Sequence, residues 1–348
     1  MGVGSKTTHP YGHAQGYYTT ASGWGSHTEG YMTLTTRPGP PSEINQGLYA
    51  HAEGVLTVCN GAFSHAEGNR TRTIGPSSHA EGGYTSASGT FSHAEGSSSL
   101  ASGAASHAEG FSTIASGIAS HAEGFDNIAS GIGSHAEGRV NTASGDYSHM
   151  EGLGNQTRAI ISASITIVSG SYSHAEGYFN KIGGQYSHAE GALNIVDAER
   201  AHVEGFRNHI TSIFSGLGNG GYAHAEGLYN SASALGCHVE GSASKATGRA
   251  AHAEGQGTLA EGISSHAEGH GTIASVKYQH VQGTFNATGS ALMIIGNGTS
   301  TSNRNNLAEF HASKFIFDTD ALPTSSLGLT TGQLYRTGSN LDDLKIKL

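Results

Sequence analysis

The sequence is poor in several residue types on which common protein classes depend. Its 348 residues include 2 cysteines, 1 tryptophan and 6 prolines, and 13% are charged. Two cysteines are too few for a disulfide framework. Cys59 and Cys237 stand where similar segments of the chain carry Ala or Ser, so we expect two small buried side chains and no reactive thiol.

Charge and hydropathy exclude two kinds of partner. The net charge is -10 and no run of Lys or Arg occurs, so a nucleic-acid partner has no electrostatic basis. No apolar stretch is long enough to span a bilayer, and we expect no membrane insertion. Residues Met1–Thr8 lack the apolar core of a secretory signal, so we expect no Sec export from this sequence.

Glycine is abundant and occurs at fixed intervals. The chain has 53 glycines, and many close the pentapeptide Ser-His-Ala-Glu-Gly, as in Ser106–Gly110 and Ser120–Gly124. Counting each His-X-Glu or His-X-Gln followed by Gly gives 18 copies between His13 and His280, most of them 14 residues apart. A short fixed period predicts a solenoid, in which each repeat forms one coil stacked on its neighbours.

Breaks in the period divide the chain. Residues Arg37–Pro41 must loop out of a sheet, Ala159–Val168 predicts an extra strand, and Gly216–Gly221 predicts a loop. After the last repeat, we expect strands at Ala291–Ile295 and Phe310–Phe317 with a turn at Gly296–Gly298. The predicted organisation is an N-terminal segment 1–10, a repeat domain 11–283 with insertions near 31–47, 153–171 and 207–221, a β cap 284–320 that covers the open end, and a tail 321–348.

Alternation along a strand predicts which side chains face inward. Ser120, Ala122 and Gly124 share one side of the strand, and His121 and Glu123 share the other. A coil of 14 residues has a thin interior, so the small residues line it and His and Glu point outward. If the strand continues, the aromatic residues before the serine and after the glycine join the outward side: Phe63, Phe91, Tyr147, Tyr172, Tyr186, Phe111, Phe125, Tyr178 and Phe206.

A thin interior of Ser, Ala and Gly predicts association. Such an interior buries too little apolar surface to offset the entropy of ordering a long chain. An outward stripe of aromatic, His and Glu side chains repeated on every coil suits a cyclic homo-oligomer.

The repeats resemble those of a known family. The 14-residue coil, with Ser-X-Ala-X-Gly on one strand and Ala-X-Gly on the other, resembles the head repeats of trimeric autotransporter adhesins over roughly residues 11 to 290. It is also similar to the version of these repeats in phage tail fibres, where Ser-His-Ala-Glu-Gly is common. Ile295–Ser300 and Gly332–Arg336 look like segments of phage and viral structural proteins.

The resemblance implies a fold and an oligomer. It implies an all-β, left-handed parallel β-roll (β-solenoid) of about 18 coils, a small C-terminal β cap, and a homotrimer that associates through the outward residues of the first strand. Autotransporter heads carry Val and Ile where this chain carries His and Glu, so the trimer interface predicted here is polar at its centre.

The His and Glu rows have three interpretations. The first is structural, with imidazole and carboxylate pairing between chains. The second is a metal ion on the trimer axis, held by His nitrogen and Glu oxygen. The third, a catalytic pair, needs one distinct pocket instead of a row of copies. We therefore predict no enzyme, no cofactor and no metal site, and a metal ion on the trimer axis is the alternative. We assign an inter-chain interface to the His and Glu residues of nine repeats: His65, Glu67, His79, Glu81, His93, Glu95, His107, Glu109, His121, Glu123, His135, Glu137, His149, Glu151, His174, Glu176, His188 and Glu190.

These observations lead to one functional hypothesis. It is a structural fibre or head module of a phage tail fibre or other virion appendage that contributes to host attachment. Its expected partners are two further copies of the chain, other tail or appendage proteins and a host surface receptor. The alternatives are a cellular trimeric surface adhesin or extracellular appendage subunit, and a metal-binding solenoid.

Overall fold

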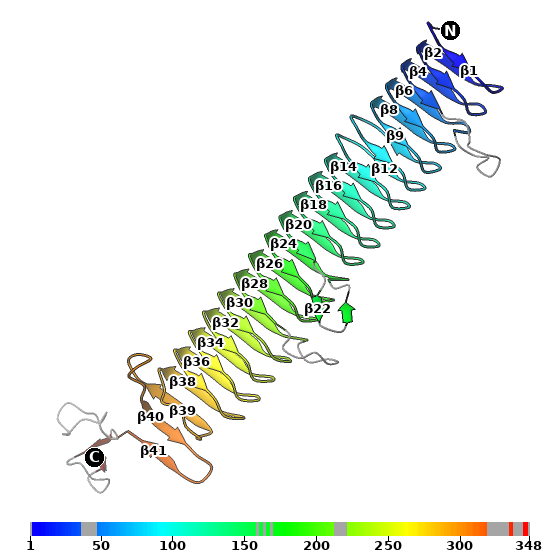
Figure 1. The fold of residues 1–348 in the computed structure, drawn as a ribbon. Coiled ribbons are helices and arrows are strands. Elements are labelled where there is room, and N and C mark those ends of the chain that lie inside the picture. Colours follow the sequence, from blue (N-terminus) through cyan, green and yellow to red (C-terminus); the bar gives the residue numbers. More distant parts are fainter. Residues whose placement is uncertain are drawn as a thin grey trace. The chain divides into compact units, whose positions relative to one another are not determined.

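The protein is an all-β parallel solenoid. The computed structural model describes residues 2–35, 47–157, 160–162, 165–167, 170–211, 221–318, 334–336 and 344–346, and these residues contain no helix. Consecutive coils are about 14 residues apart and number about 19, so the predicted all-β parallel β-solenoid is confirmed. The chain forms two compact units, Met1–Val203 and Glu204–Leu348. Within each unit the coils stack in sequence order with their strands pointing the same way (Figure 1).

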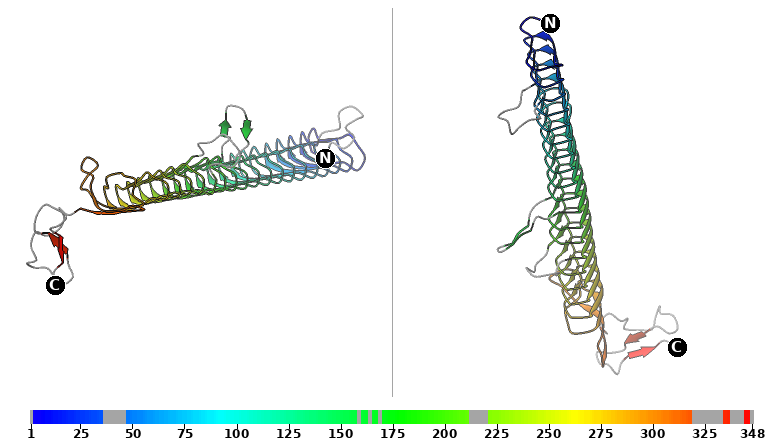
Figure 2. Two further views of the ribbon diagram at one scale, coloured as in Figure 1. Left: turned by 90° about the horizontal axis from the view of Figure 1, so that it is seen from below. Right: turned by 90° about the vertical axis from the view of Figure 1, so that its right-hand side faces the viewer.

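Each coil consists of two seven-residue halves. In the coil of Ser120 to Gly133, the first half contains β16 (His121–Phe125) and the second contains β17 (Ile128–Ala129). Each half ends on a residue with positive φ, 53° at Asp126 and 59° at Gly133. Left-handed residues of this kind recur every seventh position and turn the chain back on itself, so two strands and two corners close one coil (Figure 2).

The coils of the first unit alternate two kinds of strand, which we call long and short; the long strands have five residues except β10 and β12, which have two. The long strands begin at the repeat histidines: β2 (His13–Tyr17), β4 (His27–Tyr31), β6 (His51–Val55), β8 (His65–Asn69), β10 (His79–Ala80), β12 (His93–Ala94), β14 (His107–Phe111), β16, β18 (His135–Arg139), β20 (His149–Leu153), β24 (His174–Tyr178) and β26 (His188–Ala192). The short strands are β1 (Lys6–Thr7), β3 (Thr20–Ala21), β5 (Leu34–Thr35), β7 (Val58–Cys59), β9 (Arg72–Thr73), β11 (Ser86–Ala87), β13 (Leu100–Ala101), β15 (Ile114–Ala115), β17, β19 (Thr142–Ala143), β21 (Gln156–Thr157), β25 (Lys181–Ile182) and β27 (Ile195–Val196).

The second unit repeats this alternation and then ends it. Strand β28 (His202–Phe206) contains the division between the units. The long strands that follow are β30 (His224–Leu228), β32 (His238–Ser242), β34 (His252–Gln256), β36 (His266–His270) and β38 (His280–Thr284). The short strands are β29 (His209–Ile210), β31 (Ser231–Ala232), β33 (Lys245–Ala246), β35 (Leu259–Ala260) and β37 (Ile273–Ala274).

The interior of each coil is narrow and filled by small side chains. Ala122 and Ala129 are fully buried, and the equivalent alanines of other coils are buried to the same degree. Buried asparagines form a ladder between coils: Asn127 Nδ2 donates to Gly138 O at 2.7 Å, and the backbone N–H of Asn141 donates to Asn127 Oδ1 at 2.7 Å. The ladder gives the buried amides hydrogen-bond partners, which a polar group needs in an interior without water.

The pentapeptide glycine does not line this interior, so that part of the prediction is wrong. Gly124 has φ +99° and is exposed, and a Cβ there would lie 2.3 Å from the carbonyl oxygen of Gly138. The close approach of successive backbones requires glycine at this position because any side chain would collide with the next coil.

The C-terminal cap begins as one more coil. Strand β39 (Met293–Asn297) pairs in parallel with β38, and β40 (Asn306–Phe310) and β41 (Phe315–Phe317) then add antiparallel. The predicted turn at Gly296–Gly298 is wrong, since Gly296 lies inside β39. The single strand predicted at Phe310–Phe317 is instead two strands, because the chain reverses where His311 N–H donates to Lys314 O.

The insertions are described in part. The extra strand predicted in Ala159–Val168 is present as two strands, β22 (Ile160–Ser162) and β23 (Ile165–Ile167), which pair antiparallel. The predicted loop at Arg37–Pro41 and all but the last residue of the predicted loop at Gly216–Gly221 lie outside the described residues. In the tail, β42 (Leu334–Arg336) pairs antiparallel with β43 (Leu344–Ile346). A search of the described residues found no helix with the length and apolar character of a membrane span.

Candidate functional site

The long strands present histidine and glutamate on their outward side. Along β16, Ala122 is buried while His121 and Glu123 are half-buried. This alternation is the one expected for a strand with one face on a core. We call this outward surface, formed by the repeat His and Glu side chains, the His/Glu face.

Parallel register places like residues beside each other on this face. His107 pairs with His121, and Glu109 pairs with Glu123. The imidazole rings of His107 and His121 are stacked with centroids 4.8 Å apart. The face is therefore a row of imidazoles beside a row of carboxylates.

The stack of imidazoles is continuous within each unit. In the first unit it extends from His13 to His202, with ring centroids 4.6 to 5.0 Å apart. In the second unit it extends from His224 to His280 at 4.6 to 4.7 Å.

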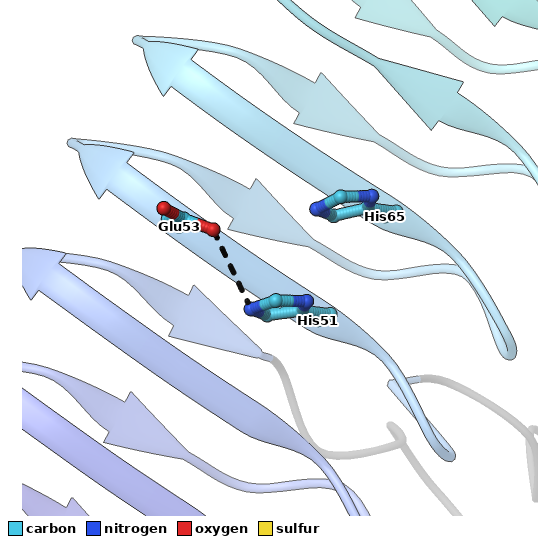
Figure 3. A group of neighbouring side chains, drawn as sticks. All are labelled: His51, Glu53 and His65. Carbon is cyan, nitrogen blue, oxygen red and sulfur yellow. Dashed lines mark ion pairs between the residues drawn. The ribbon is translucent and has the colours of Figure 1, made fainter.

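In several coils the carboxylate lies near the imidazole two residues earlier. His51 Nε2 is 3.9 Å from Glu53 Oε2 on the same strand, and His121 Nε2 is 3.5 Å from Glu123 Oε2. Figure 3 shows the first of these pairs beside His65. Such distances are too long for a good hydrogen bond. One pair between coils is closer, since His107 Nε2 lies 3.2 Å from Glu95 Oε1.

The ring nitrogens of the stack are covered but lack hydrogen bonds. The Nε2 atoms are buried and have no hydrogen-bond partner within the chain at His27, His51, His65, His79, His93, His121, His135, His149, His174, His188, His238, His252, His266 and His280. A buried polar atom without a partner is costly and rare in folded proteins. The row therefore leaves hydrogen-bonding capacity unused within the single chain.

The stack also favours neutral imidazoles. Burial lowers the pKa of His51 below its ordinary value of 6.5, and the neighbouring His65 lowers it further, while Glu53, Glu29 and Glu67 oppose the shift. The pKa values of several other stacked histidines are lowered for the same reasons: His27, His65, His79, His135, His174, His188 and His252. Desolvation and stacked imidazoles thus outweigh the carboxylates.

Groups of His, Glu and His recur along the face as candidate metal ligands. In one such group, His51, Glu53 and His65, the ligand atoms lie within 4.8 Å of one another. The rings of His51 and His65 are nearly parallel, with planes 6° apart, so their nitrogen lone pairs point the same way and do not converge on one ion. Tetrahedral coordination requires converging ligands. Two neighbouring histidines of one chain are therefore poorly placed to chelate a metal.

Comparisons with known proteins assign this chain to no family. The chain matches no protein-family model and no curated protein. The site is therefore interpreted from its own geometry.

The structure brings the predicted interface residues together in two rows. Each of the 18 residues from His65 to Glu190 lies on the outward side of a long strand or directly after it, as strand alternation predicts. The rows are longer than that prediction, because His27, His51 and the histidines of the second unit stack in the same manner. Contact between these residues and another chain remains a proposal.

The aromatic residues before the repeat serine do not continue the strand, so that prediction is wrong. Tyr147 and Tyr172 have φ of 56° and occupy the left-handed corner of their coils. Their rings stack at 5.1 Å and remain half exposed. By contrast, Phe111 and Phe125 after the glycine stay in their strands and stack at 5.1 Å.

Proposed function

We propose that this protein is one subunit of a homotrimeric structural fibre or head module, in which copies of the chain pack their His/Glu faces together. The observation that carries the proposal is the row of covered, unpartnered Nε2 atoms beside carboxylates at 3.5 to 3.9 Å. Side chains from two further copies would supply the missing partners and remove the face from water.

The narrow interior supports the same proposal. Its buried residues are mostly Ala, Ser, Thr and Asn, which remove little apolar surface from water. Large apolar side chains instead remain outside, including Tyr84, Phe91 and Tyr147 at 57, 70 and 55% exposure. Association buries such side chains and adds the stabilisation that the coil interior lacks.

A repetitive scaffold of stacked coils suits a structural role. We propose a virion appendage such as a phage tail fibre, with host attachment through segments that leave the coils, because recognition often resides on loops held by a rigid scaffold. A cellular trimeric surface adhesin uses the same architecture and is the alternative of the same class.

A metal-binding solenoid is the second candidate. The recurring His, Glu and His groups favour it, and ions would require ligands from different chains because the rings of one chain are parallel. Elemental analysis of the purified protein distinguishes the two: a stoichiometric transition metal supports this candidate, and its absence supports direct pairing of His with Glu.

Sedimentation of charge variants tests the trimer interface. Replacing three successive carboxylates of the face by lysine should separate the chains, because an ammonium cannot accept a hydrogen bond from an imidazole N–H and would be buried at the centre without a partner. The matched control places three lysines on the outward side of the short strands, where Ser102, Ser116 and Ser130 are exposed. The test variant combines Glu109→Lys, Glu123→Lys and Glu137→Lys. The control variant combines Ser102→Lys, Ser116→Lys and Ser130→Lys. Dissociation of the first variant alone supports the proposal, and equal behaviour of both contradicts it.

A further inference from the structure

The His/Glu face continues into the cap and changes its chemistry there. His280 of β38 pairs with Met293 of β39, Met293 pairs with Phe310 of β40, and Phe310 pairs with Phe315 of β41. Residues directly opposite each other on neighbouring strands share a face of the sheet. The histidine row is thus extended by Met, Phe and Phe.

The glutamate row undergoes the same change. Gln282 pairs with Ile295, and Ile295 pairs with Ala308, which pairs with Phe317. We call the surface formed by Met293, Ile295, Phe310, Phe315 and Phe317 the cap face. Ile294, on the opposite side of β39, is fully buried against the coil interior, as expected for the inward side.

The cap face is apolar and open in the single chain. Phe310 and Phe315 are 40 and 57% exposed, and their ring centroids lie 4.6 Å apart. The cap is held to the preceding coils, since Arg304 Nη1 donates to Gly271 O at 2.7 Å and Asn306 Nδ2 donates to Ala287 O at 2.8 Å. The aromatic surface is therefore presented in a fixed position.

The repeats alone cannot fix how the copies align. If one copy slides along another by one coil, His again meets His and Glu again meets Glu, because the rows repeat every 14 residues. Such a slip loses only the contacts of one coil at each end. A pairing with many equivalent registers is weakly specified unless another element selects one.

We propose that the cap faces of three copies of this chain pack together and set their axial register. The proposal rests on the homotrimer proposed above. Further copies of this chain are the expected partners of the cap face, because the cap face extends the His/Glu face strand by strand and would share its symmetry. An apolar cluster that occurs once per chain can be buried in only one alignment.

Disulfide formation at one level of the His/Glu face measures the register. Glu240→Cys on β32 places three thiols at the same level when the copies are aligned, and oxidation then joins two chains. The native thiols do not interfere, because Cys59 and Cys237 are 0 and 1% exposed and burial raises the pKa of Cys59 to about 11. The yield of covalent dimer reports the aligned fraction.

The cap variant is Phe310→Ser with Phe315→Ser, in the Glu240→Cys protein. The matched control is Ile316→Ser, which removes a 42% exposed apolar side chain from the same strand on its opposite side. We expect the cap variant to remain trimeric by sedimentation while its disulfide yield falls at least about threefold, and the control to keep the full yield.

The outcomes separate the two proposals. A trimeric cap variant with undiminished yield would overturn the role of the cap face in setting register. A folded cap variant that sediments as single chains, beside a trimeric control, would support packing of the cap faces. A protein with the native cap that sediments as single chains would overturn the homotrimer itself, and with it this inference.

Discussion

The imidazole rings of His51 and His65 lie parallel, 4.7 Å apart and with planes 6° apart, although the two residues belong to successive coils. The distance equals the spacing of neighbouring strands in a sheet, so the backbone register alone holds the rings in contact. Each ring therefore shields the next from water and disfavours its protonation.

This stacking predicts loss of stability in mild acid. The folded pKa of His51 and several other stacked histidines is below 6.5, so at lower pH the unfolded chain binds more protons than the folded chain. Stability should be complete above pH 6.5 and decrease as the pH falls through the lowered pKa values. Thermal unfolding measured between pH 8 and pH 5 checks this prediction. A melting temperature that stays constant below pH 6.5 would contradict it.

Two adjacent glycines should respond very differently to alanine. A Cβ on Gly82, at φ +97°, would lie 2.2 Å from the carbonyl oxygen of Gly96, whereas a Cβ on Gly83 has nothing within 4 Å. We expect Gly82→Ala to cost at least about 2 kcal/mol and Gly83→Ala less than about 0.5 kcal/mol. Chemical denaturation of both variants provides the comparison, and similar midpoints would refute the requirement for close backbone contact.

The buried asparagine ladder should tolerate threonine better than alanine. Asn141 Nδ2 donates to Gly152 O at 2.8 Å, and its Oδ1 accepts from Asn155 N–H at 2.7 Å. Asn141→Ala leaves these groups without partners and should cost about 2 to 3 kcal/mol. Asn141→Thr should cost less than half of that, because Thr113 fills the equivalent position and its hydroxyl donates to Ser99. An Asn141→Ala variant as stable as the native protein would show that the ladder contributes nothing, and equal destabilisation of both variants would show that threonine does not replace asparagine.

Replacing Val140 should increase the stability of the protein by relieving strain at one corner. Val140 has φ of 58° and is 41% exposed, and a β-branched side chain is strained in the left-handed region. Val140→Asn should raise the unfolding free energy by about 1 kcal/mol, since Asn adopts this conformation readily. Val140→Thr is the control, because it keeps the branched Cβ and should give no gain. A destabilised Asn variant would mean that side-chain contacts at Val140 outweigh the strain.

The coil could be predicted from sequence because its information is local. The spacing of His121 and His135 gives the period, and strand alternation places Ala122 inward and Glu123 outward. The corners could not be predicted from the sequence. A bulky residue such as Tyr147 or Val140 rarely adopts positive φ, so its presence does not indicate a left-handed corner. The seven-residue corner period is visible only in the backbone.

The cap depends on relationships that are not local. The reversal between β40 and β41 interrupts an apolar segment that predicts a single strand, and it occurs where His311 and Lys314 close a turn. The side chain of His311 is also only 16% exposed, and its Nε2 lies 3.0 Å from Glu309 Oε2, although the residue stands outside the repeat. The link from His280 through Met293 to Phe310 depends on strand register, which spacing in the sequence does not give.

Sedimentation equilibrium at pH 7.5 tests the central claim, that three chains associate through their His/Glu faces, most directly. The account predicts a single species of about three times the 35.6 kDa chain mass, which dissociates when Glu109, Glu123 and Glu137 are replaced by lysine. A stable folded species of 35.6 kDa would contradict it, because the buried imidazole nitrogens would then stay without hydrogen-bond partners in a single chain.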